Sequence, residues 1–168
     1  MTIESAVTLG VQWCARSVKT VLACAVLVST VGCSLQPAAP SSVDGASLNA
    51  SLQFCSDEIN RLRALVGRPA LARSNSLESF ATSAAQHDAS AGVPHAFFRT
   101  TNGGGVSRAE TELLLWKNYQ VKDVIRQGLA QMWNSAGEHY DVLIGPYTEV
   151  GCGVFIEGSE VSVAQDFR

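Results

Sequence analysis

The sequence lacks the short motifs that mark the most familiar enzyme classes. It has three histidines and two methionines among 168 residues, and neither a His-Glu-x-x-His motif nor a Gly-x-Ser-x-Gly motif occurs. Three glycines stand at 103–105, but no Gly-Lys-Ser/Thr follows them and the dinucleotide-binding pattern fails at Arg108. We therefore expect a flexible loop there, and no nucleophile can be identified from motifs.

Charge of either sign is also scarce. Charged residues make up 16% of the chain, the net charge is −3, and no basic block occurs. Nucleic-acid binding needs a basic surface, so we expect no nucleic-acid partner. The length and the 46% hydrophobic content provide for one domain with its own core.

The N-terminus has the pattern of an export signal. Arg16 and Lys19 precede an apolar run at 20–32, which falls short of the roughly 20 residues that span a bilayer but suits a signal-peptide core. The run ends at Val31-Gly32-Cys33, which resembles a bacterial lipobox. We expect residues 1–32 to be a lipoprotein-type signal peptide, with Cys33 lipidated and attached to a membrane of the cell envelope. A plain secretory signal cut slightly later is the alternative.

Residues 33–49 are rich in proline and serine, which predicts a flexible tether before the domain at 50–168. In that domain, apolar residues at helical spacing predict three helices, over residues 52–66, 75–91 and 121–133. Asn75 and Glu78 have the spacing of a capping box, and Gly92 is a natural helix end.

The C-terminal part of the domain has strand character. Residues 150–156 and 161–167 predict two strands around a Glu157-Gly158 turn, whereas residues 93–109 have the composition of a loop. Helices followed by an antiparallel hairpin indicate the α+β class.

Two cysteines belong to the folded domain, Cys55 and Cys152. In an oxidising compartment two such cysteines are more often paired than free, so we expect a disulfide between the first helix and the hairpin. Two buried thiols are the alternative.

The candidate chemistry lies in three separate segments. His95, Glu110 and His139 supply two imidazoles and a carboxylate, which could bind zinc with an open position or transfer protons. Their spacing is equally compatible with histidines that are merely exposed or hydrogen-bonded. His87-Asp88 has no partners at ligand spacing, and we expect that pair to be solvated.

Several stretches, in this order, resemble the CAP superfamily of cysteine-rich secretory proteins, venom antigens and plant pathogenesis-related proteins. The stretch Cys55–Ala64, followed by Gly67-Arg-Pro69-Ala-Leu71, is similar to the opening helix of that superfamily. Leu77 and Ala81–Ala85 resemble its second helix. The other resembling stretches are His95-Ala-Phe97, Ala109-Glu110-Thr111, Trp133-Asn-Ser-Ala-Gly-Glu-His139-Tyr140, Tyr147–Gly153 and Ala164–Phe167.

The resemblance implies a three-layer α-β-α sandwich with a mostly antiparallel central sheet. It also implies a cleft with two histidines and two acids, in which the histidines bind zinc in some members. His95, Glu110 and His139 match that set. Ser135 or Ala136 stands where the second acid belongs, and Glu138 is displaced to the position beside His139.

The resemblance therefore predicts two classes of function. The first is an extracytoplasmic binding module that holds a lipid, a sterol-like molecule or a peptide, with zinc as the candidate cofactor and Ser135 and Glu138 in the cleft. The alternative is a metal-dependent hydrolase of the peptidase type, in which Glu110 acts as base beside His95 and His139. Because no nucleophile is evident, binding is the leading expectation.

Overall fold

The computed structural model describes residues 45–168, and the expected signal peptide, Cys33 and most of the expected tether lie outside them. The helices are α1 (Gly45–Leu65), α2 (Asn75–Ala91), α3 (Ala96–Thr101), the 3₁₀ helix η1 (Asn102–Gly105), α4 (Val121–Asn134) and α5 (Glu138–Leu143). The strands are β1 (Ala72–Arg73), β2 (Ala109–Lys117), β3 (Glu149–Glu157) and β4 (Glu160–Phe167). Within this part of the chain, none of the helices combines the length and the hydropathy needed to cross a membrane.

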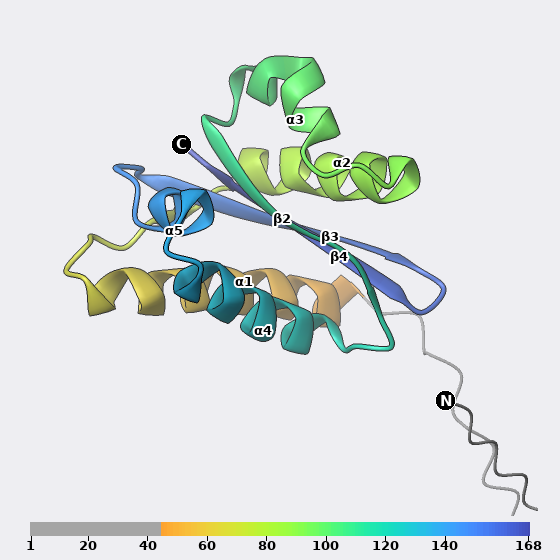
Figure 1. Ribbon diagram of the computed structural model, residues 1–168, viewed down its shortest axis with the longest axis horizontal. Coiled ribbons are helices and arrows are strands. Elements are labelled where there is room, and N and C mark those ends of the chain that lie inside the picture. The colour runs from red at the N-terminus through yellow and green to blue at the C-terminus, as the bar shows by residue number, and fades with distance from the viewer. Residues whose placement is uncertain (1–44) are drawn as a thin grey trace, which may run out of the picture. The chain divides into compact units, whose positions relative to one another are not determined.

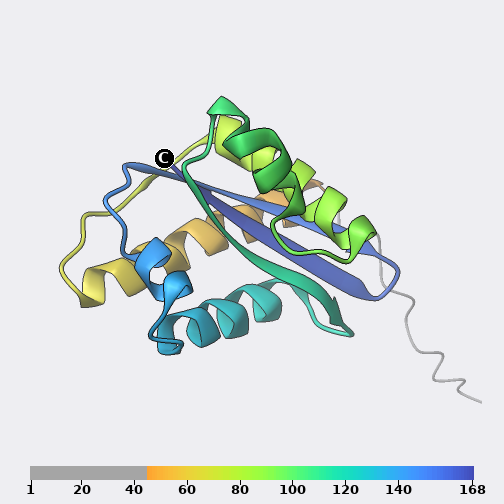
Figure 2. The same cartoon turned by 45° about the horizontal axis from the view of Figure 1, so that its top comes forward.

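The four strands form one sheet in the order β1-β3-β4-β2. Strand β4 pairs antiparallel with both β2 and β3, and the short β1 pairs parallel with β3 at the edge. Helices α2 and α3 cover one face, and α1, α4 and α5 cover the other (Figures 1 and 2). The predicted α+β class and three-layer sandwich are therefore confirmed, and the sheet is mixed because of its parallel edge.

The Gly-Cys-Gly sequence at the start of β3 shows why both layers pack so closely. Successive residues of a strand point to opposite faces. Gly151 and Gly153 lie under α2, and a Cβ added to Gly153 would come within 2.0 Å of the Thr82 backbone nitrogen. Cys152 points to the other face and forms a disulfide with Cys55 of α1, across a Cα–Cα distance of 6.4 Å. The predicted disulfide is confirmed.

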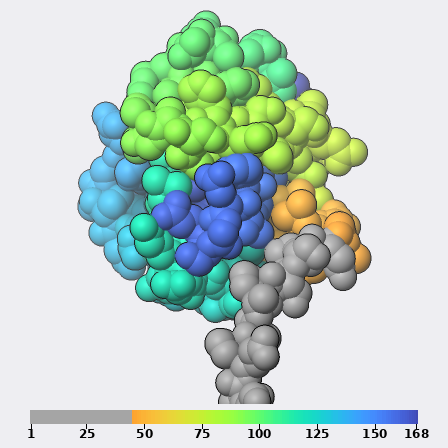
Figure 3. All heavy atoms as spheres, turned by 90° about the vertical axis from the view of Figure 1, so that its right-hand side faces the viewer, coloured from red at the N-terminus to blue at the C-terminus, as the bar shows by residue number. Residues whose placement is uncertain are grey.

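The two faces of the sheet carry different cores. The face toward α1, α4 and α5 holds a large apolar cluster that includes Ile59, Ile125, Leu129, Val163 and Phe167. Under α2 the buried cluster consists of four alanines, 81, 84, 85 and 164, with Phe97 and Phe155 packed against them. Seen from the end of the sheet that carries the β3–β4 turn, the hairpin reaches the surface beneath α2 (Figure 3).

Some local predictions were wrong. Helix α1 begins at Gly45, so the last residues of the expected tether are helical. Ser74 rather than Asn75 precedes the first turn of α2, and it makes no side-chain capping bond. Glu78 bonds to Arg73 instead of capping the helix, because β1 holds the arginine beside it.

The expected loop at 93–109 contains α3 and η1. Helix α3 forms because Phe97 packs against the alanine cluster and against Phe80, whose ring centroid lies 5.2 Å away. Strand β2 and helix α5 were not predicted either, and both contribute residues to the site described next.

Candidate functional site

The centre of the site is a pair formed by His95 and Glu110. Glu110 lies on β2, and its Oε1 is 2.9 Å from Nδ1 of His95, which stands in the turn before α3. The Glu110 side chain is 1% exposed and that of His95 is 28% exposed, so the imidazole closes a buried carboxylate off from solvent. His95 has a left-handed backbone with φ of 58°. Non-glycine residues adopt that conformation at a cost of roughly 1–2 kcal/mol, and such outliers are frequent at functional sites.

A small pocket opens next to this pair. Its volume is about 210 Å³, and it is lined by His95, Phe98, Glu110, Glu138, His139 and Val142. Glu138 and His139 are the first two residues of α5 and are both exposed. The structure thus brings together His95, Glu110 and His139, as well as Glu138. Ser135 does not line the pocket, since its hydroxyl donates to the Met132 carbonyl at the end of α4.

The pocket contains two acids, although the sequence comparison found none at position 135 or 136. Glu138 provides the second one from α5, on the same side as His139. A larger hollow over the outer side of α2, lined by Ser83, Gln86, His87, Ser90 and Ala91, contains none of the predicted site residues.

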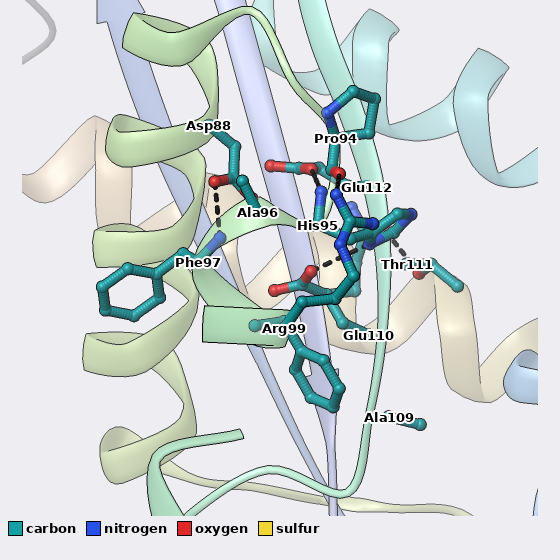
Figure 4. A network of polar contacts seen from close by, with 12 residues as sticks. Asp88, Pro94, His95, Ala96, Phe97, Arg99, Ala109, Glu110, Thr111 and Glu112 are labelled. Atoms are coloured by element: carbon teal, nitrogen blue, oxygen red, sulfur yellow. Dashed lines mark hydrogen bonds and ion pairs between the residues drawn. The ribbon is translucent and has the colours of Figure 1, made fainter. Parts of the chain in front are cut away.

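Sequence reasoning missed the buried acids behind the pocket. Strand alternation places Glu110 and Glu112 on the same face of β2, and Glu110 pairs in register with Asp166 of β4. Asp88 of α2 reaches the same region (Figure 4), where its Oδ1 accepts the Phe97 N–H at 2.8 Å. We refer to Asp88, Glu110, Glu112 and Asp166 as the acidic cluster. All four residues are buried.

The expectation for His87-Asp88 was half wrong. His87 is exposed, as expected, but Asp88 is fully buried and lies 2.7 Å from Nδ1 of His87. The signal was present in the sequence: residue 88 lies on the helical stripe of Ala81, Ala84 and Ala85, which packs on the sheet.

The acidic cluster has unused hydrogen-bonding capacity. Glu112 Oε2 accepts the backbone N–H of His95 at 2.9 Å. The atoms that have no hydrogen-bond partner within residues 45–168 are Asp88 Oδ2, Glu110 Oε2, Glu112 Oε1 and both carboxylate oxygens of Asp166. Buried polar atoms without partners are uncommon, and several in one place usually indicate a missing ion, water or proton.

Burial also changes the acidity of the cluster. Desolvation, with the nearby charges of Asp88 and Glu110, raises the pKa of Glu112 to about 8. Burial raises the pKa of Asp166 to about 8 as well, with a contribution from the neighbouring carboxylates. The pKa of His95 is raised chiefly by its hydrogen bond to Glu110. Near neutral pH, protons therefore reduce the negative charge of the cluster.

Three of these residues have the arrangement of a metal site. His95, Glu110 and Glu112 each offer a ligand atom, and these atoms lie within 4.8 Å of one another. An imidazole with two carboxylates suits divalent ions such as Zn²⁺ or Mn²⁺. His139 lines the same pocket but lies outside this group of three.

The comparison with known families decides the identity of the fold. The sequence profile of the CAP family, described as the cysteine-rich secretory protein family, matches residues 56–167. The chain belongs to the CAP family. Among curated proteins, no significant match was found.

Three solved bacterial structures are similar to this one at low sequence identity. An outer surface protein of Borrelia burgdorferi aligns with a TM-score of 0.50 and 15% identity, over 71% of this chain and 92% of its own. A cysteine-rich secretory protein of Staphylococcus aureus aligns with a TM-score of 0.48 and 16% identity, over 71% of this chain and 39% of its own. An extracellular SCP-domain protein of Bacillus anthracis aligns with a TM-score of 0.49 and 18% identity, over 71% of this chain and 41% of its own. The aligned part of this CAP chain thus spans about two fifths of the length of the last two proteins.

Proposed function

We propose that this CAP domain is an extracytoplasmic binding module that recognises a short peptide segment in the pocket beside His95. The observation that carries the proposal is the pocket itself, where two imidazoles and two carboxylates meet from three parts of the chain that are distant in sequence. Scattered histidines with no function would not be expected to converge on one concave site together with a buried acid.

The size of the pocket favours a peptide over the other ligands that the family resemblance implies. A volume of about 210 Å³ is smaller than the roughly 300–1,000 Å³ of pockets that enclose drug-sized molecules. It can enclose one side chain or a chain terminus, but not a whole sterol-like molecule. The exposed Glu138 favours a basic side chain or an amino terminus, and Phe98 and Val142 offer apolar contact to its aliphatic part.

Zinc is the cofactor that we expect in this pocket, with His95 and His139 as the imidazole ligands. Bound zinc would act as a Lewis acid toward a carbonyl or carboxylate oxygen of the ligand. The chain's own contribution is to orient His95, which is fixed by Glu110 at the ring and by Glu112 at the backbone nitrogen. Such secondary contacts tune metal ligands.

We also propose that the domain is exported and attached to a bacterial envelope membrane through Cys33. The support is the signal-like sequence at 1–32 and the extracellular or outer-surface descriptions of two relatives with this fold. Metabolic labelling with a fatty acid should mark the full chain and should fail for Cys33→Ser. Equal labelling of both proteins would contradict the lipid attachment.

The alternative is a metal-dependent hydrolase of the peptidase type, with Glu110 as base. One observation favours it: Glu138 restores a second acid to the pocket. The binding role is better supported, because the carboxylate of Glu110 is already hydrogen-bonded to His95 and is almost inaccessible.

Binding can be tested with a peptide library displayed against the purified full-length protein. We expect enrichment of segments with a basic residue or a free amino terminus, and loss of that enrichment in Glu138→Gln. Ser135→Ala is the matched control, because Ser135 is near in sequence but does not line the pocket. Cleavage of the enriched peptides would favour the hydrolase, and no enrichment would overturn the proposal.

A further inference from the structure

We infer that His95, Glu110 and Glu112 form a binding site for a divalent cation on the sheet side of the pocket. The inference deepens the proposed function, since it places the metal of the same pocket on β2 and makes His139 a secondary contact. Glu112 is the residue that nothing in the sequence pointed to.

The three side chains lie close enough together to share one ion. Their candidate ligand atoms lie within 4.8 Å of one another, so one ion could reach all three. Glu110 Oε2 and Glu112 Oε1 are buried and have no hydrogen-bond partner within the described residues. Each carboxylate thus uses one oxygen to hold His95 and keeps the other free (Figure 4).

Further negative charge lies behind the three ligands. Asp166 is fully buried, stands directly opposite Glu110 in the β2–β4 register, and has two unpartnered oxygens. Like charges directly opposite in an antiparallel pair are destabilising. Asp88 adds a fourth buried carboxylate, whose Oδ2 is also unpartnered.

Within residues 45–168, no lysine or arginine forms an ion pair with these acids. Every ion pair of lysine or arginine in residues 45–168 involves other carboxylates. Arg99 lies nearest along the chain, but its guanidinium donates to the Pro94 carbonyl at 2.7 Å. The four buried carboxylates pair with only two imidazoles, those of His95 and His87. They therefore form a site of excess negative charge, which a divalent ion would compensate.

The donor set also limits which ion binds. Carboxylate oxygens are harder ligands than imidazole nitrogens, and hard ligands suit Mn²⁺. Mn²⁺ should therefore compete with Zn²⁺ better at this site than at a site made only of histidines. The open side of the pocket, toward Glu138 and His139, leaves room for water or for an oxygen of the ligand.

Calorimetric titration of Zn²⁺ and of Mn²⁺ into the full-length protein at pH 7.5 tests the inference. Substitutions of residues beyond the direct ligands of a metal typically cost 10- to 100-fold in affinity, so losing a direct ligand in Glu112→Gln should cost at least about 100-fold. The glutamine keeps an oxygen that accepts the His95 N–H and removes a buried charge, so the variant is expected to fold. Asp166→Asn should show a smaller loss, and Glu157→Gln, which changes an acid of the exposed hairpin turn, should show none.

The results separate this inference from the proposed function. Loss of Zn²⁺ binding in Glu112→Gln, with near-normal binding in His139→Ala, supports the cation site on β2. Loss in His139→Ala but not in Glu112→Gln overturns the inference and leaves the two-histidine metal site intact. No binding of either ion at millimolar concentration overturns the inference too, and then protons alone compensate the acidic cluster. Peptide selection without added metal tests the binding role independently.

Discussion

The two faces of the sheet differ in the side chains that they bury: one buries mainly large apolar residues, and the other buries small residues and acids. Strand β4 shows this residue by residue: Val161, Val163 and Phe167 belong to the apolar core, and alternate residues such as Ala164 and Asp166 lie in the layer under α2. The first face is tied to α1 by a disulfide, whereas the second face ends in unpartnered carboxylates. One face is an apolar core, and the other holds the candidate site.

Buried charge makes the contrast clearer. The apolar face also buries a charged group, since Arg63 is 1% exposed. Its guanidinium donates to the carbonyls of Pro69, Leu143 and Gly145, which links α1 to the segment before β3. The acidic cluster has no comparable set of partners. A buried charged group that is well hydrogen-bonded is structural. Buried carboxylate oxygens without a partner lower stability and are better explained by function.

The largest effect should come from the disulfide on the apolar face. The Cys55–Cys152 bridge closes a loop of 97 residues, for which the chain-entropy model gives roughly 4–5 kcal/mol. We expect the Cys55→Ala, Cys152→Ala double variant to lose about that amount in urea unfolding. The reduced wild-type protein should behave similarly. A loss below about 1 kcal/mol would show that the apolar core alone maintains this layer.

The next effect belongs to the acidic face and depends on pH. The pKa of Glu112 is raised from 4.5 to about 8, so the folded state binds more protons than the unfolded state in that interval. Stability should therefore fall as pH rises from about 4.5 to about 8. Since each pKa unit corresponds to about 1.4 kcal/mol, Glu112→Gln should stabilise the metal-free protein by up to roughly 4 kcal/mol near pH 8.

The same substitution should change little at pH 4.5. The charged groups that act on Glu112 are Asp88, Glu110 and His95, and the substitution leaves all three in place. Glu157→Gln serves as the exposed control. A Glu112→Gln variant that is less stable than wild type at pH 8 would mean that the charged Glu112 carboxylate stabilises the folded state. That result would contradict the claim that the acidic cluster lowers stability.

A third prediction concerns the close approach of α2 to β3. Gly153→Ala would place a Cβ 2.0 Å from the Thr82 nitrogen and 2.1 Å from the Ala81 carbonyl carbon, so the backbones must separate. We expect a loss of about 3 kcal/mol, at the upper end of overpacking effects, measured by thermal unfolding. Gly45→Ala, with nothing within 4 Å, should be nearly neutral. Equal behaviour of the two variants would contradict the tight packing of this layer.

The smallest effect on stability should come from the rim of the pocket. Glu138 and His139 are exposed and have no hydrogen bond that would be lost. Glu138→Gln and His139→Ala should therefore change the free energy of unfolding by less than about 0.5 kcal/mol, while Glu138→Gln weakens peptide selection. A loss of several kcal/mol in either variant would assign these residues a structural role instead.

The apolar face was easier to predict from the sequence than the acidic face. Helical periodicity located α1, α2 and α4, and strand patterns located β3 and β4. Two cysteines in a domain expected to be exported predicted their bridge. These signals are local, or they concern residues with few possible partners. His95, Glu110 and His139 were candidates because of their side-chain chemistry, and the family resemblance strengthened that prediction. The three residues do line one pocket.

The acidic cluster could not be predicted in the same way. Glu112 and Asp166 are polar residues whose burial depends on the pairing of β2 with β4, which lie about 50 residues apart. Strand β2 was missed because its Glu-Thr-Glu segment lacks the alternation of apolar and polar residues that usually identifies a strand. Once β2 is known, period-two alternation places Glu110 and Glu112 on one face, and the cluster follows.

The most direct test of the functional face is a crystal structure of the full-length protein soaked in Zn²⁺, with anomalous data at the zinc edge. The account predicts an anomalous peak bounded by His95, Glu110 and Glu112, with the unpartnered oxygens of the two glutamates turned toward it. A peak elsewhere, or no peak in a well-ordered pocket, would contradict the claim that the acidic face of this CAP domain is a cation site.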